Sequence, residues 1–482
     1  VNVFDRAETV DNIYFAIFQA EREVRWNGNV KKLKLVTVND PFAAGYDPLK
    51  PTFDMIAQNT NPPTPGISQV DGRIFTDALT YWTDPLGADV VAYDPDPLAG
   101  EVSGKDGRSI TRGGSGQQVT GYLDDGVGEY NGDPAGARQV YTEDPDGSST
   151  NNLLGLDARD TGAATGAMDE IRPYLDPNDV LTEDNERGLI GWIRGLEDVT
   201  SNSNADASRP WLMSDPMHSR PLVINYGDSD GDPDTGYTKD NPDIRLFFGT
   251  NDGVFHVVRN TSPVGSESGA DGFAFVPLEL LPGQAALQAN GQQTVEPHIY
   301  GLDGEAVSYV IDADGDGNLV SGNGSNDSVM VYIGMRRGGK ALYAFNMTDP
   351  DAPLLEWKIT SEDTDFTQLG MTFSRPFATE IDLDGDGTRT PLLIFAGGYN
   401  GGWMKDGSNA RIGKDIDGNR AADDIGNAIY VVNAETGALV WKALGPGVDA
   451  ASDTADSVFR HADMLHSIPC LLYTSPSPRD RS

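Results

Sequence analysis

The sequence is poor in cysteine, in basic residues and in long apolar segments. Its 482 residues contain one cysteine, Cys470, so no internal disulfide can form. Lysine and arginine number 35 against 74 aspartates and glutamates, giving a net charge of −39. Such a surface repels phosphate backbones, so we expect no nucleic-acid partner. No apolar run approaches the roughly 20 residues of a membrane-spanning helix, so we expect no transmembrane segment.

The excess of acidic residues favours divalent cations, a salty extracellular medium, or both. The length of 482 residues predicts two to four domains or one large repeat architecture. Counted with Gly and without Tyr, apolar residues make up about 46% of the chain, which is within the ordinary globular range. The chain begins at Val1 and shows no charged segment followed by an apolar one. This predicts that a signal peptide has been removed or that the sequence is an internal piece.

The last residues look foreign to the rest of the chain. Residues 470–480 read CLLYTSPSPRD, which resembles the translation of a common sequencing adapter. An ordinary Ser/Pro-rich tail is the alternative. The adapter interpretation predicts that native sequence stops at Pro469 and that residues 470–482 pack against nothing.

Residues 211–469 contain an internal repeat. Each copy reads as a strand, an acidic loop, a second strand, a Gly-containing turn and a further strand. The copies comprise LVINY (222–226), DSDGDPD (228–234) and IRLFFGTNDGVFHVV (244–258); AVSYVI (306–311), DADGDGN (312–318) and SVMVYIGMRRGGKALYAFN (328–346); and FATEI (377–381), DLDGDGT (382–388) and PLLIFAGGYNGG (391–402).

The outer strands repeat as well, with Trp357 and Trp441 at equivalent places. Strings of four-stranded antiparallel units with period-2 apolar residues are typical of propeller blades, and a β-sandwich array is the alternative. We therefore expect a mainly β protein: a modified β-propeller over 211–469, truncated at its C-terminal side, preceded by a mixed α/β, loop-rich region over 1–210. The two tryptophans are expected to pack blade against blade.

The N-terminal region has less regular patterns. Residues 10–22 have helical or mixed periodicity, and 183–196 read as a helix. Asn27-Gly28 predicts the turn of a hairpin over 25–36, with Lys31 and Lys32 on a solvated face. Two further segments are expected to lack regular structure: residues 99–166 as long exposed loops, and 200–208 as a linker.

Four acidic segments carry the candidate chemistry. Aspartates at positions 1, 3 and 5 of a tight loop can wrap a hard cation, while positions 7 and 9 add oxygens. The candidate ligands are Asp228, Asp230, Asp232 and Asp234; Asp312, Asp314, Asp316 and Asn318; Asp382, Asp384, Asp386 and Thr388; and Asp415, Asp417, Asn419 and Asp423.

Calcium is the expected ion, because Mg²⁺ demands stricter octahedral geometry. Asp423 gives the loop at 415 an extra carboxylate, whereas Pro233 makes the loop at 228 the least convincing. No loop has Glu at position 12, so none is an EF-hand. The alternative is that these segments are hairpin turns held by aspartate side chains.

Little in the sequence points to catalysis. The five histidines, at 218, 256, 298, 461 and 466, show no pair with metal-ligand spacing, and we expect them to be structural. Fingerprints of serine hydrolases, zinc proteases, P-loops and dinucleotide-binding folds do not occur in a fitting context. We therefore expect a protein that is not an enzyme.

Several segments resemble the PilY/PilC family of type IV pilus tip-associated proteins, in the right order and over most of residues 10–469. They are RWNGNVKKLKL (25–35), ARQVYTE (137–143), GLIGWIRGLED (188–198), PMHSRPLVINYG (216–227), FFGTNDGVFHVV (247–258) and MLHSIP (464–469). The resemblance implies a C-terminal modified β-propeller, promotion of pilus assembly, opposition to retraction and surface adhesion. It also implies a place on the bacterial surface, at the pilus tip or in the outer membrane or periplasm. The partners would be minor pilins and a host or abiotic surface.

One departure from the family concerns calcium. In the family, the segment matching His466 to Pro469 leads into another strand and another Asp-rich loop, linked to control of retraction. That role is not transferred to the four loops of this chain, which are calcium candidates on their own spacing. Two alternatives stay open: a quinoprotein dehydrogenase, suggested by the Thr436-Gly437 turn followed by Trp441, and a generic calcium-loop propeller that binds a carbohydrate or protein.

Overall fold

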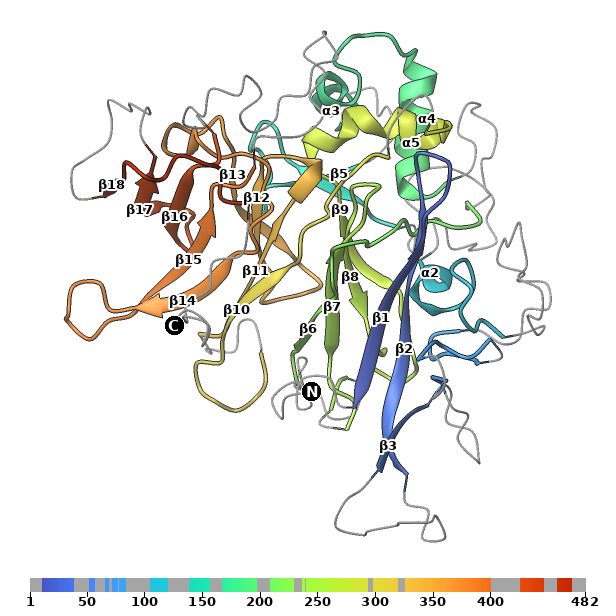
Figure 1. Ribbon diagram of the computed structural model, residues 1–482. Coiled ribbons are helices and arrows are strands. Elements are labelled where there is room, and N and C mark those ends of the chain that lie inside the picture. The colour runs from blue at the N-terminus through green and yellow to red at the C-terminus, as the bar shows by residue number, and fades with distance from the viewer. Residues whose placement is uncertain are drawn as a thin grey trace. The chain divides into compact units, whose positions relative to one another are not determined.

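The computed structural model (Figure 1) is built mainly from β-strands, as predicted. It describes residues 11–38, 52–56, 66–68, 72–76, 78–83, 105–119, 138–156, 167–196, 209–228, 236–238, 240–293, 298–319, 326–399, 425–445 and 457–469. The chain divides into two compact units. Unit 1 comprises Val1–Pro145, Leu154–Ile299 and Gly317–Leu319, and unit 2 comprises Asp146–Leu153, Tyr300–Asp316 and Val320–Ser482.

Unit 1 begins with a long hairpin that corrects two predictions. Strand β1 (Asn12–Gln19) pairs antiparallel with β2 (Asn27–Val38), which pairs in turn with β3 (Thr52–Ile56). The apolar run IYFAIF is therefore a strand and not a helix, since a short continuous run fits either period. Asn27-Gly28 lies inside β2, opposite Gln19 and Phe18. A Cβ on Gly28 would lie 2.4 Å from the Ser214 carbonyl oxygen, so the glycine serves a close backbone approach, not a turn.

The expected solvated face of Lys31 and Lys32 is also wrong, because both side chains are fully buried. Lys31 Nζ donates to Asp106 Oδ2 at 2.9 Å and to the Gly107 carbonyl at 2.8 Å. Lys32 Nζ donates to Glu267 Oε2 at 2.6 Å. Strand β2 is covered on both faces, so each lysine has a carboxylate partner from a distant segment.

The prediction of exposed loops over 99–166 fails at 105–119. This segment carries the short helix α2 (Gly114–Gln118) and buries Asp106 and Ser115. Asn29 of β2 holds it in place: the Nδ2 group donates to the Gly113 carbonyl at 2.9 Å, and Oδ1 accepts the Gly116 N–H at 2.9 Å. Asp106 accepts a hydrogen bond from Lys31 of the hairpin, and Ser115 Oγ donates to the Gly269 carbonyl at 2.7 Å, so both are buried with their hydrogen bonds satisfied.

A six-stranded sheet completes unit 1, in the order β5-β4-β9-β8-β7-β6. Its last three strands, β8-β7-β6, confirm the first predicted repeat, whereas β9 was not predicted. The strands are β4 (Tyr141–Glu143), β5 (Leu153–Gly155), β6 (Leu222–Asn225), β7 (Ile244–Gly249), β8 (Phe255–Arg259) and β9 (Asp271–Phe275). Because β4 pairs in parallel with β9, the sheet takes strands from both sides of residue 210. The division into 1–210 and 211–469 stays a prediction.

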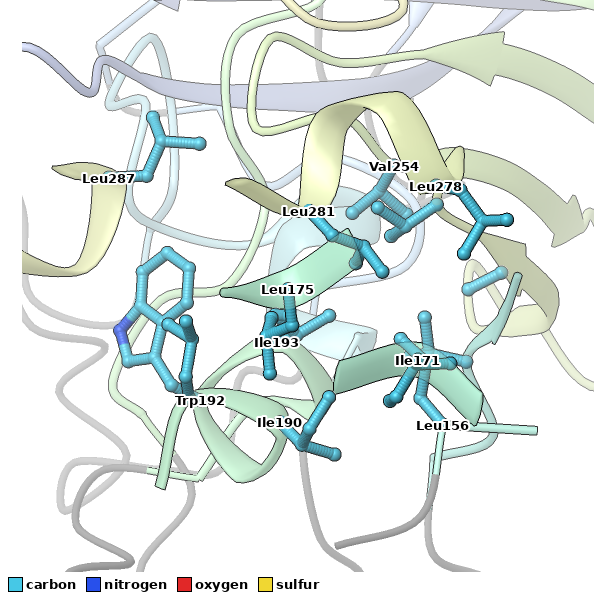
Figure 2. Packing of buried hydrophobic residues seen from close by; sticks show 14 of the residues in the cluster. Leu156, Ile171, Leu175, Ile190, Trp192, Ile193, Val254, Leu278, Leu281 and Leu287 are labelled. Carbon is cyan, nitrogen blue, oxygen red and sulfur yellow. The ribbon is translucent and has the colours of Figure 1, made fainter. Parts of the chain in front are cut away.

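Helices cover part of this unit and enclose an apolar core (Figure 2). They are α3 (Ala167–Leu175), α4 (Glu183–Arg194), the 3₁₀ helix η1 (Leu278–Gly283) and α5 (Gln284–Ala289). Helix α4 confirms the prediction for 183–196. It begins at Thr182, whose side chain accepts the Asn185 N–H, and ends at Gly195 with φ 112°. Its buried Ile190 and Ile193 pack in one cluster with Ile171 and Leu281.

Unit 2 holds two sheets that confirm the second and third repeats. One is the four-stranded antiparallel sheet β10 (Val307–Ile311), β11 (Ser328–Gly334), β12 (Leu342–Asn346) and β13 (Leu354–Ile359). The other comprises β14 (Phe377–Ile381), β15 (Thr390–Ala396), β16 (Ala428–Asn433), β17 (Leu439–Leu444) and β18 (Val458–Arg460), the last pair parallel. Two 3₁₀ turns, η2 (Arg336–Gly338) and η3 (Thr364–Phe366), complete the unit.

The two sheets of unit 2 share one apolar core, in which Trp357 joins them. Trp357 of β13 donates its indole N–H to the Ala434 carbonyl at 3.1 Å. The turn after β16 places Gly437, with φ 70°, so close to this ring that a Cβ would lie 2.9 Å away. Trp357 therefore packs one blade-type sheet against the next, as predicted. Trp441, at the equivalent place in β17, stacks on Phe459 with centroids 6.3 Å apart.

The predicted linker at 200–208 and the foreign tail at 470–482 lie outside the described residues. Within the described part of the chain, no helix combines the length and the apolar character needed to span a bilayer.

Candidate metal centres

The acidic loops of the repeat occupy equivalent places in the three sheets that carry them. Each one follows the first strand of its repeat and leads into the second: 228–234 between β6 and β7, 312–318 between β10 and β11, and 382–388 between β14 and β15. In Figure 1 the last two are extended hairpin loops beyond the strands. In the described loops, 312–318 and 382–388, the repeat therefore presents the same acidic chemistry at the same point of the two sheets of unit 2.

The loop between β10 and β11 gathers a carboxylate that the sequence reasoning missed. Asp312, Asp314 and Asp327 each place a carboxylate oxygen within 4.8 Å of the others. The strand register pairs Ile311 with Ser328, so Asp312 and Asp327 flank the last pair of the hairpin. Asp327 Oδ1 also accepts the Ala313 N–H at 2.9 Å. An aspartate immediately before the return strand could have revealed this ligand.

Backbone hydrogen bonds fold this loop around its aspartates. Asp312 Oδ1 accepts the Gly315 N–H at 2.7 Å, and Asp314 Oδ1 accepts the Asp316 N–H at 3.2 Å. Gly315 and Gly317 have φ angles of 74° and 84°. Nothing lies within 4 Å of a Cβ at either glycine, so the backbone conformation, not lack of space, favours glycine there.

The loop between β14 and β15 has the same construction. Asp382, Asp384 and Asp386 bring carboxylate oxygens within 4.8 Å of one another, and all three are exposed. Asp382 accepts the N–H groups of Gly385 and Gly387 at 2.7 and 3.0 Å. Asp386 accepts the Thr388 N–H at 2.7 Å, which lowers the pKa of Asp386 below its ordinary value. Asp386 is therefore expected to be ionised near neutral pH.

Both clusters fit the donor set of a hard cation. Calcium takes oxygen ligands at about 2.3–2.6 Å, so two ligands on one ion lie at most about 5 Å apart. Three carboxylates within 4.8 Å satisfy that limit in each loop. Exposure leaves room for water ligands to complete the shell. If an ion binds, Asp312, Asp314 and Asp327 would hold it in one loop, and Asp382, Asp384 and Asp386 in the other.

Other predicted ligands are arranged differently. Within the described residues, the carboxylate of Asp316 belongs to neither of these two clusters. Thr388 contacts Asp386 through its backbone N–H. Asn318 Oδ1 instead accepts the Asp228 N–H at 2.9 Å. The remaining predicted ligands lie outside the described residues: Asp230, Asp232, Asp234, Asp415, Asp417, Asn419 and Asp423.

In unit 1, Thr250, His256 and Asp271 follow one another in the order of a hydrolase triad, but Thr250 and His256 are not accessible from solvent. His256 Nδ1 lies 2.9 Å from Asp271 Oδ1, and Thr250 Oγ1 lies 3.4 Å from His256 Nε2. Burial by itself would raise the pKa of Asp271, but His256 and Arg138 outweigh it and lower that pKa. Thr250 is fully buried and its hydroxyl contacts Asp252 at 2.5 Å. The cluster therefore stabilises the sheet interior and offers no site for a substrate.

Blade-type antiparallel sheets with acidic loops after their first strands define a mainly β protein of the modified-propeller class. No profile of a known protein family matches the chain. The chain is 27% identical over 204 residues to the type IV pilus biogenesis factor PilY1 of Pseudomonas aeruginosa (strain UCBPP-PA14). The matched segment covers 40% of this chain and 16% of that protein. It is 31% identical over 148 residues to a PilY1 homolog of Xylella fastidiosa (strain Temecula1 / ATCC 700964), covering 31% of the chain and 10% of the homolog.

A solved structure, the C-terminal domain of Pseudomonas aeruginosa PilY1, matches 45% of this chain and 35% of its own, with 22% identity and a TM-score of 0.24. The two sequence relatives confirm the resemblance to the PilY/PilC family. The chain spans 16% and 10% of their lengths.

Proposed function

We propose that this chain is part of a type IV pilus biogenesis factor that acts at the pilus tip without catalysing a reaction. The observation that supports this most is its similarity to two proteins named as PilY1 pilus biogenesis factors. In this role the protein promotes pilus assembly, opposes retraction and adheres to a host or abiotic surface. Its partners are minor pilins, and its place is the bacterial surface or the periplasm on the way there.

We further propose that the acidic loops bind calcium. Three carboxylates gathered within 4.8 Å repel one another when no cation is present. Calcium on Asp312, Asp314 and Asp327, or on Asp382, Asp384 and Asp386, would remove that repulsion and stiffen the hairpin. Extracellular calcium modules bind with Kd values near 10⁻⁴–10⁻³ M, so a millimolar medium would occupy such loops.

Deletion of the gene that contains this chain tests the biogenesis role. Surface pili are counted by electron microscopy in the parent strain, in the deletion and in the deletion complemented by the intact gene. We expect pili to be lost in the deletion and restored by the intact gene. A normal pilus number in the deletion would contradict the proposal.

The quinoprotein alternative depends on the turn that contains Thr436 and Gly437. In unit 2 this turn packs on Trp357, which accounts for the motif by sheet packing alone. An absorbance spectrum after incubation with pyrroloquinoline quinone and calcium separates the two proposals, because a bound quinone absorbs where the protein does not. A generic calcium-loop propeller is distinguished by the gene neighbourhood, since a pilus factor is expected beside minor pilin genes.

A further inference from the structure

Unit 2 contains a cavity whose chemistry differs from the rest of this acidic chain. Its volume is about 180 Å³, and it lies where β10 and β14 begin, beside the turn between β11 and β12. Glu305, Arg336, Thr372, Phe373 and Arg375 are among its lining residues. The turn itself reads MRRGGK over 335–340, which places three cations within five residues. The equivalent turn between β7 and β8 reads TNDG over 250–253 and holds no cation.

Arg336 is held in a conformation that the sequence does not favour. Its φ angle is 49°, in the left-handed region that non-glycine residues adopt uncommonly. Its guanidinium carbon lies 5.4 Å from the centroid of the Phe373 ring. Its Nε is shielded from solvent and has no hydrogen-bond partner among the described residues. Strain of this kind persists where the surroundings fix the residue, and it gathers at ligand sites.

The wall of the cavity is fixed by hydrogen bonds that do not involve Arg336. The Thr372 hydroxyl accepts the Met335 N–H at 2.8 Å and donates to the Ala341 carbonyl at 3.0 Å. The Thr372 N–H donates to the Gly339 carbonyl at 3.2 Å. One buried side chain thus ties both ends of the cationic turn. The cavity is therefore preformed, and a ligand need not order it on binding.

The charges define the ligand. Arg336 and Arg375 contribute two positive charges, and Glu305, whose Oε2 lies 3.4 Å from Arg375 Nε, contributes one negative charge. The net charge of one favours a monoanion over a doubly charged phosphate. A guanidinium matches the planar fork of a carboxylate, and the Phe373 ring offers an apolar surface. Drug-sized ligands occupy about 300–1,000 Å³, so a cavity of about 180 Å³ accepts a smaller unit.

We propose that this cavity binds the carboxylate of a ligand about the size of one sugar or one amino-acid residue, with Arg336 as the principal contact. The cavity does not include the acidic loops, and its proposed ligand goes beyond the function proposed above. The carboxylate comes either from a sugar acid or from the end of a peptide, and the two sources are distinguished by experiment.

The test is calorimetric titration of the intact chain in a calcium-free buffer at low salt. D-glucuronate represents the sugar acid and N-acetyl-L-alanine the peptide end, while D-glucose and N-acetyl-L-alaninamide are their neutral counterparts. We expect one carboxylate to bind at least about tenfold more tightly than its neutral counterpart, since hydrogen bonds to charged groups carry that much selectivity. Absence of binding by both carboxylates up to 10 mM, or equal binding of a neutral counterpart, overturns the proposal.

Arg336→Gly is the decisive variant, because glycine adopts φ 49° without strain. We expect an unchanged or higher melting temperature together with at least a tenfold loss of carboxylate affinity. Arg375→Gln, at an exposed side chain, is expected to weaken binding several-fold without affecting folding. Arg389→Gln is the matched control, because Arg389 pairs with Glu380 outside the cavity. This variant should bind the carboxylate with the same affinity as the parent chain. Unchanged affinity in Arg336→Gly overturns the assignment.

Discussion

The buried ion pairs of unit 1 and the acidic loops of unit 2 are opposite arrangements of charged residues. In unit 1, Lys31 and Arg245 are fully buried and each meets a buried carboxylate, Asp106 and Asp243 respectively. In unit 2, the aspartates after β10 and β14 lie close to other aspartates and are largely exposed. Burying a charge is unfavourable unless a partner lies within hydrogen-bond distance, so unit 1 satisfies its charges internally. Unit 2 leaves like charges together, which invites a cation from solution.

The largest expected effect comes from breaking a buried pair in unit 1. Lys31→Met leaves the Asp106 carboxylate buried opposite a methyl group, although Thr80 still donates to it. Removing one partner of a buried ion pair lowers the free energy of unfolding by about 3–5 kcal/mol. Urea unfolding followed by tryptophan fluorescence measures it. Lys34→Met, at a residue whose side chain is 36% exposed, is the control and should change stability by less than about 1 kcal/mol. Equal effects of the two variants would contradict the distinction.

Calcium should act on unit 2 and not through the buried pairs. Binding to the folded state alone stabilises by about 2.7 kcal/mol at a hundredfold excess over Kd. We expect chelation to lower the melting temperature in calorimetry, and calcium to restore it better than magnesium. Asp382→Ala with Asp384→Ala, and Asp312→Ala with Asp327→Ala, should each remove part of the response.

Asp463→Ala is the control for the calcium response, because the Asp463 side chain is 91% exposed. Calcium should shift the melting temperature of this variant as much as that of the parent chain. The loop at 415 stays a prediction, and Asp415→Ala with Asp417→Ala tests it in the same way. If no melting shift occurs up to about 10 mM calcium, ten times the upper end of the usual extracellular Kd range, the loops are turns only.

A smaller effect is expected where the Gly437 turn packs against Trp357 in unit 2. Gly437→Ala places a methyl group against the Trp357 ring and forces alanine to adopt φ 70°. The left-handed conformation costs about 1–2 kcal/mol for a residue with a Cβ. Urea unfolding measures this loss. Gly385→Ala tests the left-handed strain without the contact, because nothing lies within 4 Å of its Cβ. It should therefore cost less, and a larger loss at Gly385 would contradict the role of the Trp357 contact.

The smallest expected effect is a pH dependence of unit 1. Burial lowers the pKa of Lys32 to about 8, although Glu267 raises it in part. Above pH 8 the folded state has lost this proton and the unfolded state keeps it until about pH 10.4. Stability therefore rises with pH in this window. We expect the parent chain to gain about 1 kcal/mol relative to Lys32→Met between pH 8 and pH 9. A constant difference between the two proteins across that range would exclude the lowered pKa.

Local patterns predicted the elements of the repeat but not the burial of charged residues in the N-terminal region. Alternating apolar residues and Asp/Gly loops placed β6 to β8 and β10 to β17 along the chain, because strand periodicity and turn chemistry are properties of neighbouring residues. The same reasoning expected Lys31 and Lys32 on a solvated face. Their burial depends on Asp106 and Glu267, which lie far along the chain, and no local pattern contains those partners.

The ligands of the candidate metal centres also divide into those that local spacing predicted and those that it did not. The spacing of Asp312 and Asp314, and of Asp382, Asp384 and Asp386, identified two loops whose carboxylates the structure brings together. Asp327 was missed because it joins its cluster through the pairing of β10 with β11, across the hairpin. Asn318 was included by its position, but its side chain accepts a hydrogen bond from Asp228 instead.

The sequence by itself determined the mainly β character, the positions of the acidic loops and the resemblance to the PilY/PilC family, since all three depend on residues close together in the chain. The tertiary structure alone decided that Gly28 lies within a strand against Ser214, that two lysines are buried, and that Arg336 lies beside Phe373 above a cavity. The physical reason is that burial and close approach are set by segments that meet only after folding, when each charge must find a partner within a few ångströms.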